Sequence, residues 1–315
     1  MPASRTATGD LLARARSGDK RSIARLVSVV ENDEPGAAEA IRELYPKTGH
    51  AQTVGITGPP GGGKSTLVNR LAGLYRERAA RVAIVAVDPS SPFSGGAILG
   101  DRIRMRERFL DDGIFIRSMA SRGHAGGLAR ATARVVNVLD ALGTDIVLVE
   151  TVGVGQEEVD VIRVVDTVCL VTVPGLGDDI QAIKAGIIEI ADVLVVNKAD
   201  RPGADDAARD LAQMLSLAKD RPWKTPIVRT SAQSGDGLPQ LVEAIDKHRA
   251  WSRESGDHLE RRRAAARSEV EALLQEALLR ELEGRVGESR LDAAVTRVAD
   301  RTIDPYGAVE ELLRR

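Results

Sequence analysis

Short apolar runs alternate with segments of helical periodicity through most of this chain. Runs rich in β-branched and aliphatic residues predict β-strands at 53–57, 82–87, 113–118, 146–150, 167–173, 193–197 and 226–230. Between them, apolar residues recur three or four positions apart, as on one face of a helix. Strands that alternate with helices predict an α/β fold, in which a doubly wound, mostly parallel sheet carries helices on both faces. Ligands bind such sheets at the carboxyl ends of the strands.

Two further helical segments flank this region. Before it, apolar residues at helical spacing predict helices, which are interrupted at Pro35-Gly36. After it, the composition shifts to Arg, Glu and Ala, and one apolar stripe that must be buried comprises Val270, Leu273, Leu274, Ala277 and Leu278. We therefore predict an N-terminal helical extension at 1–49, the α/β domain at 50–250 and a C-terminal helical arm at 251–315.

The first predicted strand runs directly into a phosphate-binding motif. The sequence GPPGGGKS, residues 58–65, fits the P-loop pattern G-x-x-x-x-G-K-[ST]. Glycines let successive backbone N–H groups point at phosphate oxygens, and the following helix adds its positive N-terminal dipole. Lys64 is expected to reach the β and γ phosphates, and Ser65 to place its hydroxyl on Mg²⁺. The residues predicted to bind phosphate are Gly58, Gly61, Gly62, Gly63, Lys64, Ser65 and Thr66.

Acidic residues follow two of the other predicted strands. Asp88 opens a loop rich in Gly, Ser and Pro that extends to Asp101, and such a loop can act as a switch ordered by a γ-phosphate and Mg²⁺. Asp88 and Asp101 are either metal ligands or turn and capping residues. Glu150 occupies a Walker B position, and Gly153 can offer its N–H to the γ-phosphate. The predicted catalytic residues are Lys64, Asp88, Asp101 and Glu150, and the predicted metal ligands are Ser65 and the same three carboxylates.

The water-positioning residue is not evident. Gln156 lies three positions after Gly153, whereas the corresponding glutamine of Ras-like enzymes is adjacent to the glycine. We therefore expect slow hydrolysis unless a partner or another loop completes the site.

A second motif selects the base. The sequence Asn197-Lys198-Ala199-Asp200 follows a predicted strand, and an aspartate there can accept both the N1–H and the 2-amino N–H of guanine, which adenine does not present. After the next strand, Ser231 and Ala232 match a short motif whose backbone contacts the guanine oxygen. The predicted base-binding residues are Asn197, Lys198, Asp200, Ser231 and Ala232, and the predicted ligands are GTP or GDP with Mg²⁺.

Longer strings of the chain resemble one family of P-loop GTPases, the MeaB/ArgK type, the methylmalonyl-CoA mutase-associated GTPases. They are DPSSPFSGGAILGDRIRM from Asp88, SMASRGHAGGL from Ser118, ETVGVGQEEVDV from Glu150, PGLGDDIQAIKAGIIE from Pro174 and DPYGAVEELL from Asp304. GTPases in general do not share these strings.

The resemblance implies a homodimeric GTPase that acts as a chaperone of an adenosylcobalamin-dependent methylmalonyl-CoA mutase or a related acyl-CoA mutase. Such a chaperone gates cofactor loading and protects the mutase from inactivation. The resemblance also implies that Asp178, Gln181 and Lys184 couple the nucleotide state to the mutase, and that the C-terminal arm forms the dimer contact. From the residues alone, Gln181 and Lys184 would be an exposed helix face, and the arm could instead pack on its own α/β domain.

Composition excludes several other classes. The 44 Lys and Arg residues nearly balance the 46 Asp and Glu residues, which argues against a nucleic-acid partner. A single cysteine, Cys169, excludes a disulfide within the chain and makes a structural zinc site unexpected. No apolar stretch approaches the roughly 20 residues that span a bilayer, and the first residues lack the apolar core of a signal peptide. We expect a cytoplasmic protein without a membrane partner, with a short organelle transit peptide as the alternative.

Two other functions fit a P-loop GTPase domain. A metallochaperone needs soft or imidazole ligands, but the four histidines are scattered and Cys169 has no partner cysteine. His124, in a glycine-rich loop, is better suited to a switch or partner contact. A kinase of a transport protein would need an acceptor site and ATP, and Asp200 argues against ATP. A scaffold that binds GTP without useful turnover differs only in whether the nucleotide is cleaved.

Overall fold

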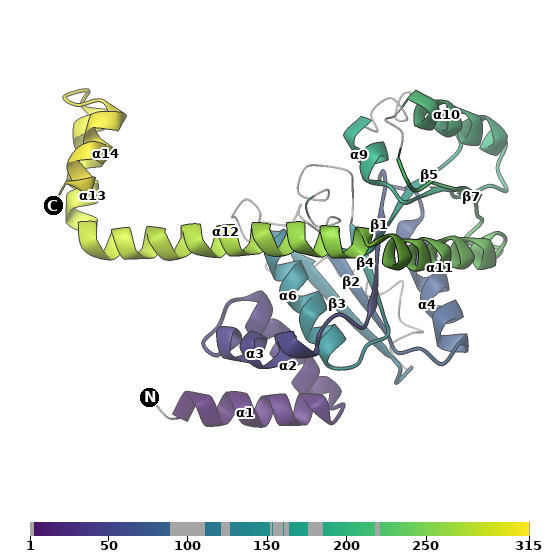
Figure 1. Cartoon of the computed structure of the whole chain (residues 1–315), viewed down its shortest axis with the longest axis horizontal. Helices are drawn as coiled ribbons and strands as arrows, with labels where there is room; N and C mark the ends of the chain where they lie inside the picture. The colour runs from purple at the N-terminus through teal and green to yellow at the C-terminus, as the bar shows by residue number, and fades with distance from the viewer. Residues whose placement is uncertain are drawn as a thin grey trace. The chain divides into compact units, whose positions relative to one another are not determined.

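A computed structural model describes residues 3–88, 111–120, 127–151, 153, 160, 164–175, 185–217 and 221–314 of the chain. The chain forms two compact units, residues 1–259 and 260–315. In the first unit a central sheet carries helices on both faces, and the second unit is entirely helical (Figure 1).

The sheet has seven parallel strands in the order β3-β2-β4-β1-β5-β6-β7. The strands are β1 (Gln52–Thr57), β2 (Val82–Asp88), β3 (Ile114–Ala120), β4 (Ile146–Thr151), β5 (Thr167–Thr172), β6 (Val193–Val196) and β7 (Ile227–Arg229). The predicted α/β class with a doubly wound parallel sheet is confirmed.

The central strands are buried on both faces. Every residue of β1, β4 and β5 is buried, which explains why these strands read as continuous apolar runs rather than as alternating patterns. The strand order reverses at β1, which lies between β4 and β5. The crevice at the carboxyl end of β1 is therefore the expected ligand site of this topology.

The N-terminal helices belong to the first unit. They are α1 (Ala3–Arg16), α2 (Lys20–Glu31), α3 (Ala37–Leu44) and the 3-10 helix η1 (Tyr45–Lys47), and α2 and α3 pack against α6 (Gly127–Ala141). The connection from η1 to β1 is fixed by Asp140 of α6, whose carboxylate accepts the backbone N–H groups of Gly49, His50 and Ala51. Leu26 and Val27 of α2 are fully buried in the core formed on this face.

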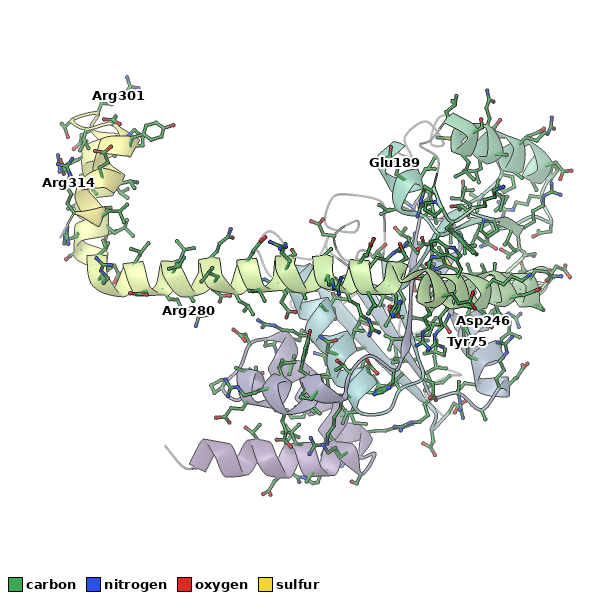
Figure 2. All side chains as sticks on the ribbon, in the orientation of Figure 1. Tyr75, Glu189, Asp246, Arg280, Arg301 and Arg314 are labelled. Carbon is green, nitrogen blue, oxygen red and sulfur yellow. The ribbon has the colours of Figure 1, made fainter. Side chains whose placement is uncertain are left out.

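Helices α4 (Lys64–Glu77) and α11 (Leu238–Ser255) pack together on the opposite face. Tyr75 of α4 lies close to Asp246 of α11 (Figure 2). Burial, reinforced by the negative charge of Asp246, raises the pKa of the Tyr75 phenol, so this side chain stays protonated at neutral pH. Cys169 of β5 is fully buried in the same core, and burial raises the pKa of its thiol.

Helices α9 (Ala185–Ile190) and α10 (Ala204–Leu217) complete the first unit beside β6. Their apolar residues pack against Leu170, Leu194 and Val196, which alternate along the strands with the residues that face α11. The helices therefore cover both faces of the sheet at this edge as well.

A buried polar cluster lies at the amino ends of β5 and β6. Asp192, directly before β6, accepts the N–H of Val168 at 2.9 Å and lies 3.2 Å from a guanidinium nitrogen of Arg221. His248 of α11 is also fully buried, with Nε2 3.3 Å from Asp192 and Nδ1 2.9 Å from the hydroxyl of Thr167. The indoles of Trp223 and Trp251 pack against the His248 ring.

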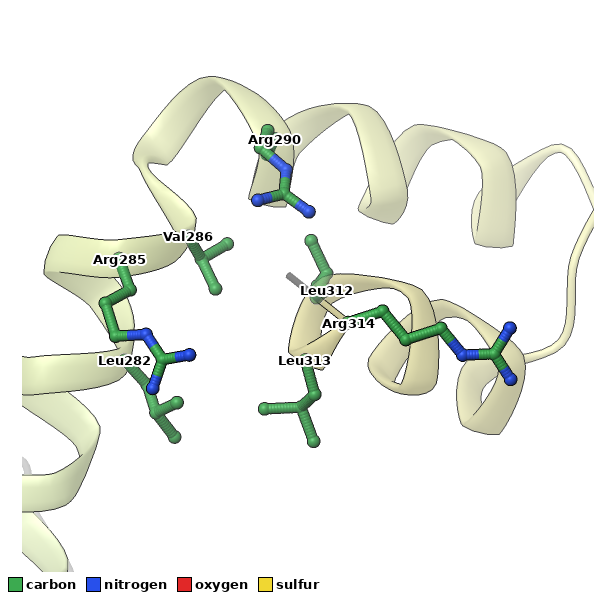
Figure 3. Close-up of a pocket in the computed structure, with 7 residues that line it drawn as sticks. All are labelled: Leu282, Arg285, Val286, Arg290, Leu312, Leu313 and Arg314. Carbon is green, nitrogen blue, oxygen red and sulfur yellow. The ribbon is translucent and has the colours of Figure 1, made fainter.

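The second unit is formed by α12 (Asp257–Val286) from residue 260 onward, α13 (Glu288–Ala299) and α14 (Pro305–Leu313). It contains a cavity of about 220 Å³ lined by Leu282, Arg285, Val286, Arg290, Leu312, Leu313 and Arg314 (Figure 3). None of the predicted nucleotide-binding residues lines this cavity.

Apolar side chains on α12 are exposed. Val270, Leu274 and Leu278 have relative exposures of 63, 57 and 50%. These residues belong to the predicted apolar stripe, which the described part of the chain does not bury. Among the described helices, none is both long enough and apolar enough to cross a membrane.

Candidate nucleotide-binding site

The P-loop connects β1 to α4, and two of its glycines allow no side chain. Gly58 has a φ of +146°, and a Cβ there would lie 2.1 Å from the carbonyl oxygen of Val171 on β5. Gly63 precedes α4 with a φ of +83°, and a Cβ there would lie 2.5 Å from Nδ2 of Asn197. Non-bonded heavy atoms do not approach this closely, so both positions require glycine.

Lys64 is buried and bonded to the loop that contains it. Its side chain lies at the first turn of α4 and donates from Nζ to the carbonyl oxygens of Gly58 at 2.7 Å and Pro59 at 2.9 Å. A buried ammonium needs such acceptors because its desolvation is costly. Lys64 therefore lies against the P-loop, where its hydrogen bonds can shift from these carbonyls to phosphate oxygens.

Asn197 links three loops at the carboxyl ends of the strands. Its Nδ2 donates to the carbonyl oxygen of Gly62 at 2.8 Å, and its Oδ1 accepts the Thr230 hydroxyl at 3.2 Å and the Ala232 N–H at 3.1 Å. Lys198 adds a bond from Nζ to the carbonyl oxygen of Gly61 at 2.8 Å. The predicted base-binding segments and the P-loop thus form one hydrogen-bonded body.

Asp200 lies on the exposed side of this body. A hydrogen bond from the Ser231 hydroxyl is the main cause that lowers the pKa of the Asp200 carboxyl. The group is therefore ionised at neutral pH and can accept hydrogen bonds. Ser231 also orients the backbone beside Ala232, because its hydroxyl accepts from the N–H of Ser234 at 3.4 Å.

The structure brings together two of the predicted Mg²⁺ ligands. Ser65, in the first turn of α4, donates its hydroxyl to Oε1 of Glu150 at the end of β4, at 2.5 Å. These are hard oxygen donors, which Mg²⁺ prefers, and they adjoin the phosphate cradle. Among the described residues, no three His, Cys, Asp or Glu side chains gather at one point. The arrangement fits a Mg²⁺ ion that also binds phosphate oxygens.

Of the remaining predicted residues, some are described by the structure and the others lie outside the described residues. Gly61 and Gly62 lie in the P-loop, Thr66 in the first turn of α4, and Gly153 two residues beyond β4. Asp88 ends β2, level with Ala120 of β3. The side chain of Asp88, and residues Asp101, Gln156, Asp178, Gln181 and Lys184, lie outside the described residues, as does His124.

Three threonines at this end of the sheet have contacts that the motif search missed. Thr230 bonds to Asn197, and Thr57 and Thr151 bond to each other and to the carbonyl oxygen of Gly153. The available signal was a hydroxyl residue at the end of an otherwise apolar strand. That signal is weak, because threonine also suits strands for its shape.

The chain matches known proteins over most of its length. The model of the family described as "Methylmalonyl Co-A mutase-associated GTPase MeaB" matches residues 23–286. A protein of Pyrococcus abyssi named as a GTPase is 47% identical over 309 residues, covering 97% of this chain and 95% of its own length. GTPase ArgK of Escherichia coli is 35% identical over 243 residues, covering 74% of this chain and 73% of its own length.

Two further proteins extend the comparison. The mouse protein "Methylmalonic aciduria type A homolog, mitochondrial" is 37% identical over 231 residues, covering 72% of this chain and 56% of its own length. A crystal structure described as a LAO/AO transport system kinase superposes with a TM-score of 0.72 at 25% identity, covering 98% of this chain and 96% of that one. The family match, the relatives and the P-loop on a parallel sheet agree, and the chain belongs to the MeaB family of P-loop GTPases, which bind guanine nucleotides and hydrolyse GTP.

Proposed function

We propose that this GTPase is a chaperone of an adenosylcobalamin-dependent acyl-CoA mutase, with methylmalonyl-CoA mutase as the first client to test. The GTP cycle would gate loading of the mutase with its cofactor and protect the mutase from inactivation. The observation that carries this proposal is the match of residues 23–286 to a family described by its association with that mutase. The mouse relative named for methylmalonic aciduria supports the same client class. We place this activity in the cytoplasm.

In the proposed nucleotide-bound state, Lys64 leaves two neutral carbonyls for the β and γ phosphates. The exchange is favourable because hydrogen bonds from an ammonium to an anionic oxygen are stronger than those to a neutral carbonyl. Lys64 then neutralises charge that develops during cleavage of the γ-phosphate. The backbone N–H groups of the P-loop, from Gly61 to Thr66, hold the remaining phosphate oxygens.

Mg²⁺ would be held by the hydroxyl of Ser65 and the carboxylate of Glu150, with Asp88 and Asp101 as the further candidates. When bound there, the ion would supply positive charge that stabilises the phosphates of the nucleotide. Ser65 and Glu150 already lie 2.5 Å apart, so little rearrangement of these side chains is needed. Asp200 reads the guanine edge, while Asn197 and Lys198 keep the base-binding loop attached to the P-loop.

The C-terminal arm is proposed as the homodimer contact. On α12 the leucines and valines that remain exposed include Val270, Leu274 and Leu278, and a second copy of the same helix is a partner of matching chemistry. Leu274→Glu should convert the dimer to a monomer, as measured by light scattering after gel filtration. Leu217→Glu on α10, where the leucine is 82% exposed, is the matched control and should remain dimeric. A dimer in both variants would place the contact elsewhere.

The client is tested with the purified protein and the mutase from the same organism. We expect the mutase to co-elute with the GTPase and to raise its GTP hydrolysis rate, and we expect Lys64→Ala to abolish that rate. Co-elution without a faster rate would indicate that the protein acts only as a scaffold. If the mutase neither co-elutes nor raises the rate, methylmalonyl-CoA mutase is excluded as the client. Transfer of radiolabelled phosphate to a protein substrate, with ATP competing against GTP, would instead favour the kinase activity for which the structural relative is named.

A further inference from the structure

Two buried threonines lie side by side under the P-loop. Thr57 is the last residue of β1 and Thr151 the last residue of β4, and the pairing of Ile56 with Glu150 puts the two threonines level in adjacent parallel strands. Their relative exposures are 3% and 0%. The Thr151 hydroxyl donates to Oγ1 of Thr57 at 3.0 Å.

Both hydroxyls converge on one backbone oxygen. Thr57 donates to the carbonyl oxygen of Gly153 at 2.9 Å, and Oγ1 of Thr151 lies 3.2 Å from the same oxygen. The two hydroxyls are buried and Gly153 is half-buried, so a lost hydroxyl would remove a donor from a partly shielded carbonyl, which is costly. The two hydroxyls therefore hold Gly153 against the ends of β1 and β4.

The geometry leaves the other polar group of Gly153 available. Its carbonyl is held, whereas no described group accepts its N–H. Thr57 is directly followed by Gly58, the first residue of the P-loop. The same hydroxyl thus fixes the distance between the P-loop and a backbone donor that lies beside it.

We propose that Thr57 and Thr151 are positioning residues that set the preference of this site for GTP over GDP. They hold Gly153 where its N–H can reach the γ-phosphate, and this inference rests on the proposed role of Gly153 as γ-phosphate donor. The P-loop contacts to the α and β phosphates are common to both nucleotides. A contact made only to the γ-phosphate is the one that distinguishes them.

The test compares the affinities of the full-length protein for GDP and for a non-hydrolysable GTP analogue by calorimetric titration. In Thr57→Val, which keeps the side-chain shape and removes the hydroxyl, affinity for the analogue should fall about tenfold, while affinity for GDP should stay within about twofold. Thr57→Ser should restore the wild-type ratio. Thr151→Val should show a smaller loss, because it acts on Gly153 mainly through Thr57.

Thr167→Val is the matched control. Thr167 is a fully buried strand threonine with one hydroxyl bond, to His248, but it lies at the amino end of the sheet. Its loss should lower thermal stability by a similar amount without changing the ratio of the two affinities. A ratio that falls equally in Thr57→Val and Thr167→Val would reduce the effect to general destabilisation and overturn the proposal.

Gly153→Pro tests the role of the Gly153 N–H separately from the threonine contacts to its carbonyl, which we call the tether, since proline lacks the N–H. If Gly153→Pro lowers the affinity ratio and Thr57→Val does not, the tether is wrong and the role of Gly153 stands. If neither variant lowers it while both remain folded by circular dichroism, both ideas are wrong. If the affinity ratio falls in both Gly153→Pro and Thr57→Val, and Thr57→Ser restores it, the tether and the role of Gly153 are both supported.

Discussion

The two ends of the central sheet both bury charged side chains, but they hold them in different ways. At the amino end, the Asp192 carboxylate faces the Arg221 guanidinium, the His248 ring and a backbone N–H. At the carboxyl end, the Lys64 ammonium donates to the neutral carbonyls of Gly58 and Pro59.

The difference shows which buried charge can change partner. Removing one member of the Asp192 cluster leaves an uncompensated charge in the core, so the cluster has one stable arrangement. The carbonyls of Gly58 and Pro59, two of the acceptors of Lys64, are weaker acceptors than a phosphate oxygen, so an incoming nucleotide can improve on these two contacts. Asp192 and Lys64 are both buried, but the Asp192 cluster at the amino end stabilises the fold, whereas Lys64 at the carboxyl end can exchange its partners for a ligand. We call the carboxyl end the exchangeable end.

The largest expected effect is at the exchangeable end. Lys64→Ala should reduce kcat/KM for GTP by on the order of 10²–10³ or more, because the transition state loses a cation at the β and γ phosphates. The melting temperature should change far less than the rate. Steady-state phosphate release and thermal unfolding measure the two quantities. A variant that keeps near-normal turnover would remove Lys64 from the mechanism.

The opposite pattern is expected at the amino end. Asp192→Ala should lower the free energy of unfolding by about 3 kcal/mol, because the buried His248 and the partly buried Arg221 lose their carboxylate. Denaturant titration measures this loss. The GTP hydrolysis rate per folded molecule should stay close to that of the wild type at low temperature. A large drop in that rate with unchanged stability would show that the two ends are coupled.

At the same end of the sheet, Asp200→Asn tests base recognition separately from phosphate binding by Lys64. The hydrogen bond from Ser231 lowers the pKa of Asp200, so the carboxylate persists throughout the neutral pH range and base selectivity should be flat there. The variant should bind GTP more weakly, on the order of 10- to 100-fold, and should gain affinity for xanthosine triphosphate, whose 2-oxygen can accept from an amide. Unchanged discrimination between the two bases in competition binding would exclude Asp200 as the reader.

The smallest effect is expected where charges are exposed. Arg229 on β7 pairs with Asp205 on α10 at 2.6 Å, with side-chain exposures of 54 and 73%. Arg229→Gln should change the free energy of unfolding by less than about 0.5 kcal/mol, since water screens the pair. A loss comparable to that of Asp192→Ala would mean that burial does not decide the strength of these contacts.

Local pattern was sufficient to predict the sheet. Each predicted run contains or overlaps a strand, because a strand buried on both faces is a continuous apolar segment. The ends were less accurate: the run predicted at 113–118 extends to Ala120, and the run at 226–230 keeps only Ile227–Arg229. The α/β class and the P-loop at the end of β1 follow from short sequence spacings and are confirmed.

Contacts between distant segments could not be predicted in the same way. His248 and Thr167 are 81 positions apart, and Thr151 and Thr57 are 94 apart. Their contact depends on strand order, which periodicity does not reveal. The side chain of Asn197 illustrates the same limit, because its bonds to Gly62, Thr230 and Ala232 join segments that are far apart in the sequence. The nucleotide contacts assigned by motif remain predictions.

Because Cys169 is buried, the rate at which a thiol reagent labels it can measure how often the sheet unfolds. It is the chain's one cysteine, and it lies in the middle of the sheet with a protonated thiol. A thiolate is the nucleophile that attacks a maleimide, so the buried, protonated thiol of the native chain should not react until the sheet separates. The labelling rate would then follow unfolding of the first unit alone, since residues 260–315 hold no cysteine. A fluorophore placed on an introduced surface cysteine would report on that site without removing Cys169.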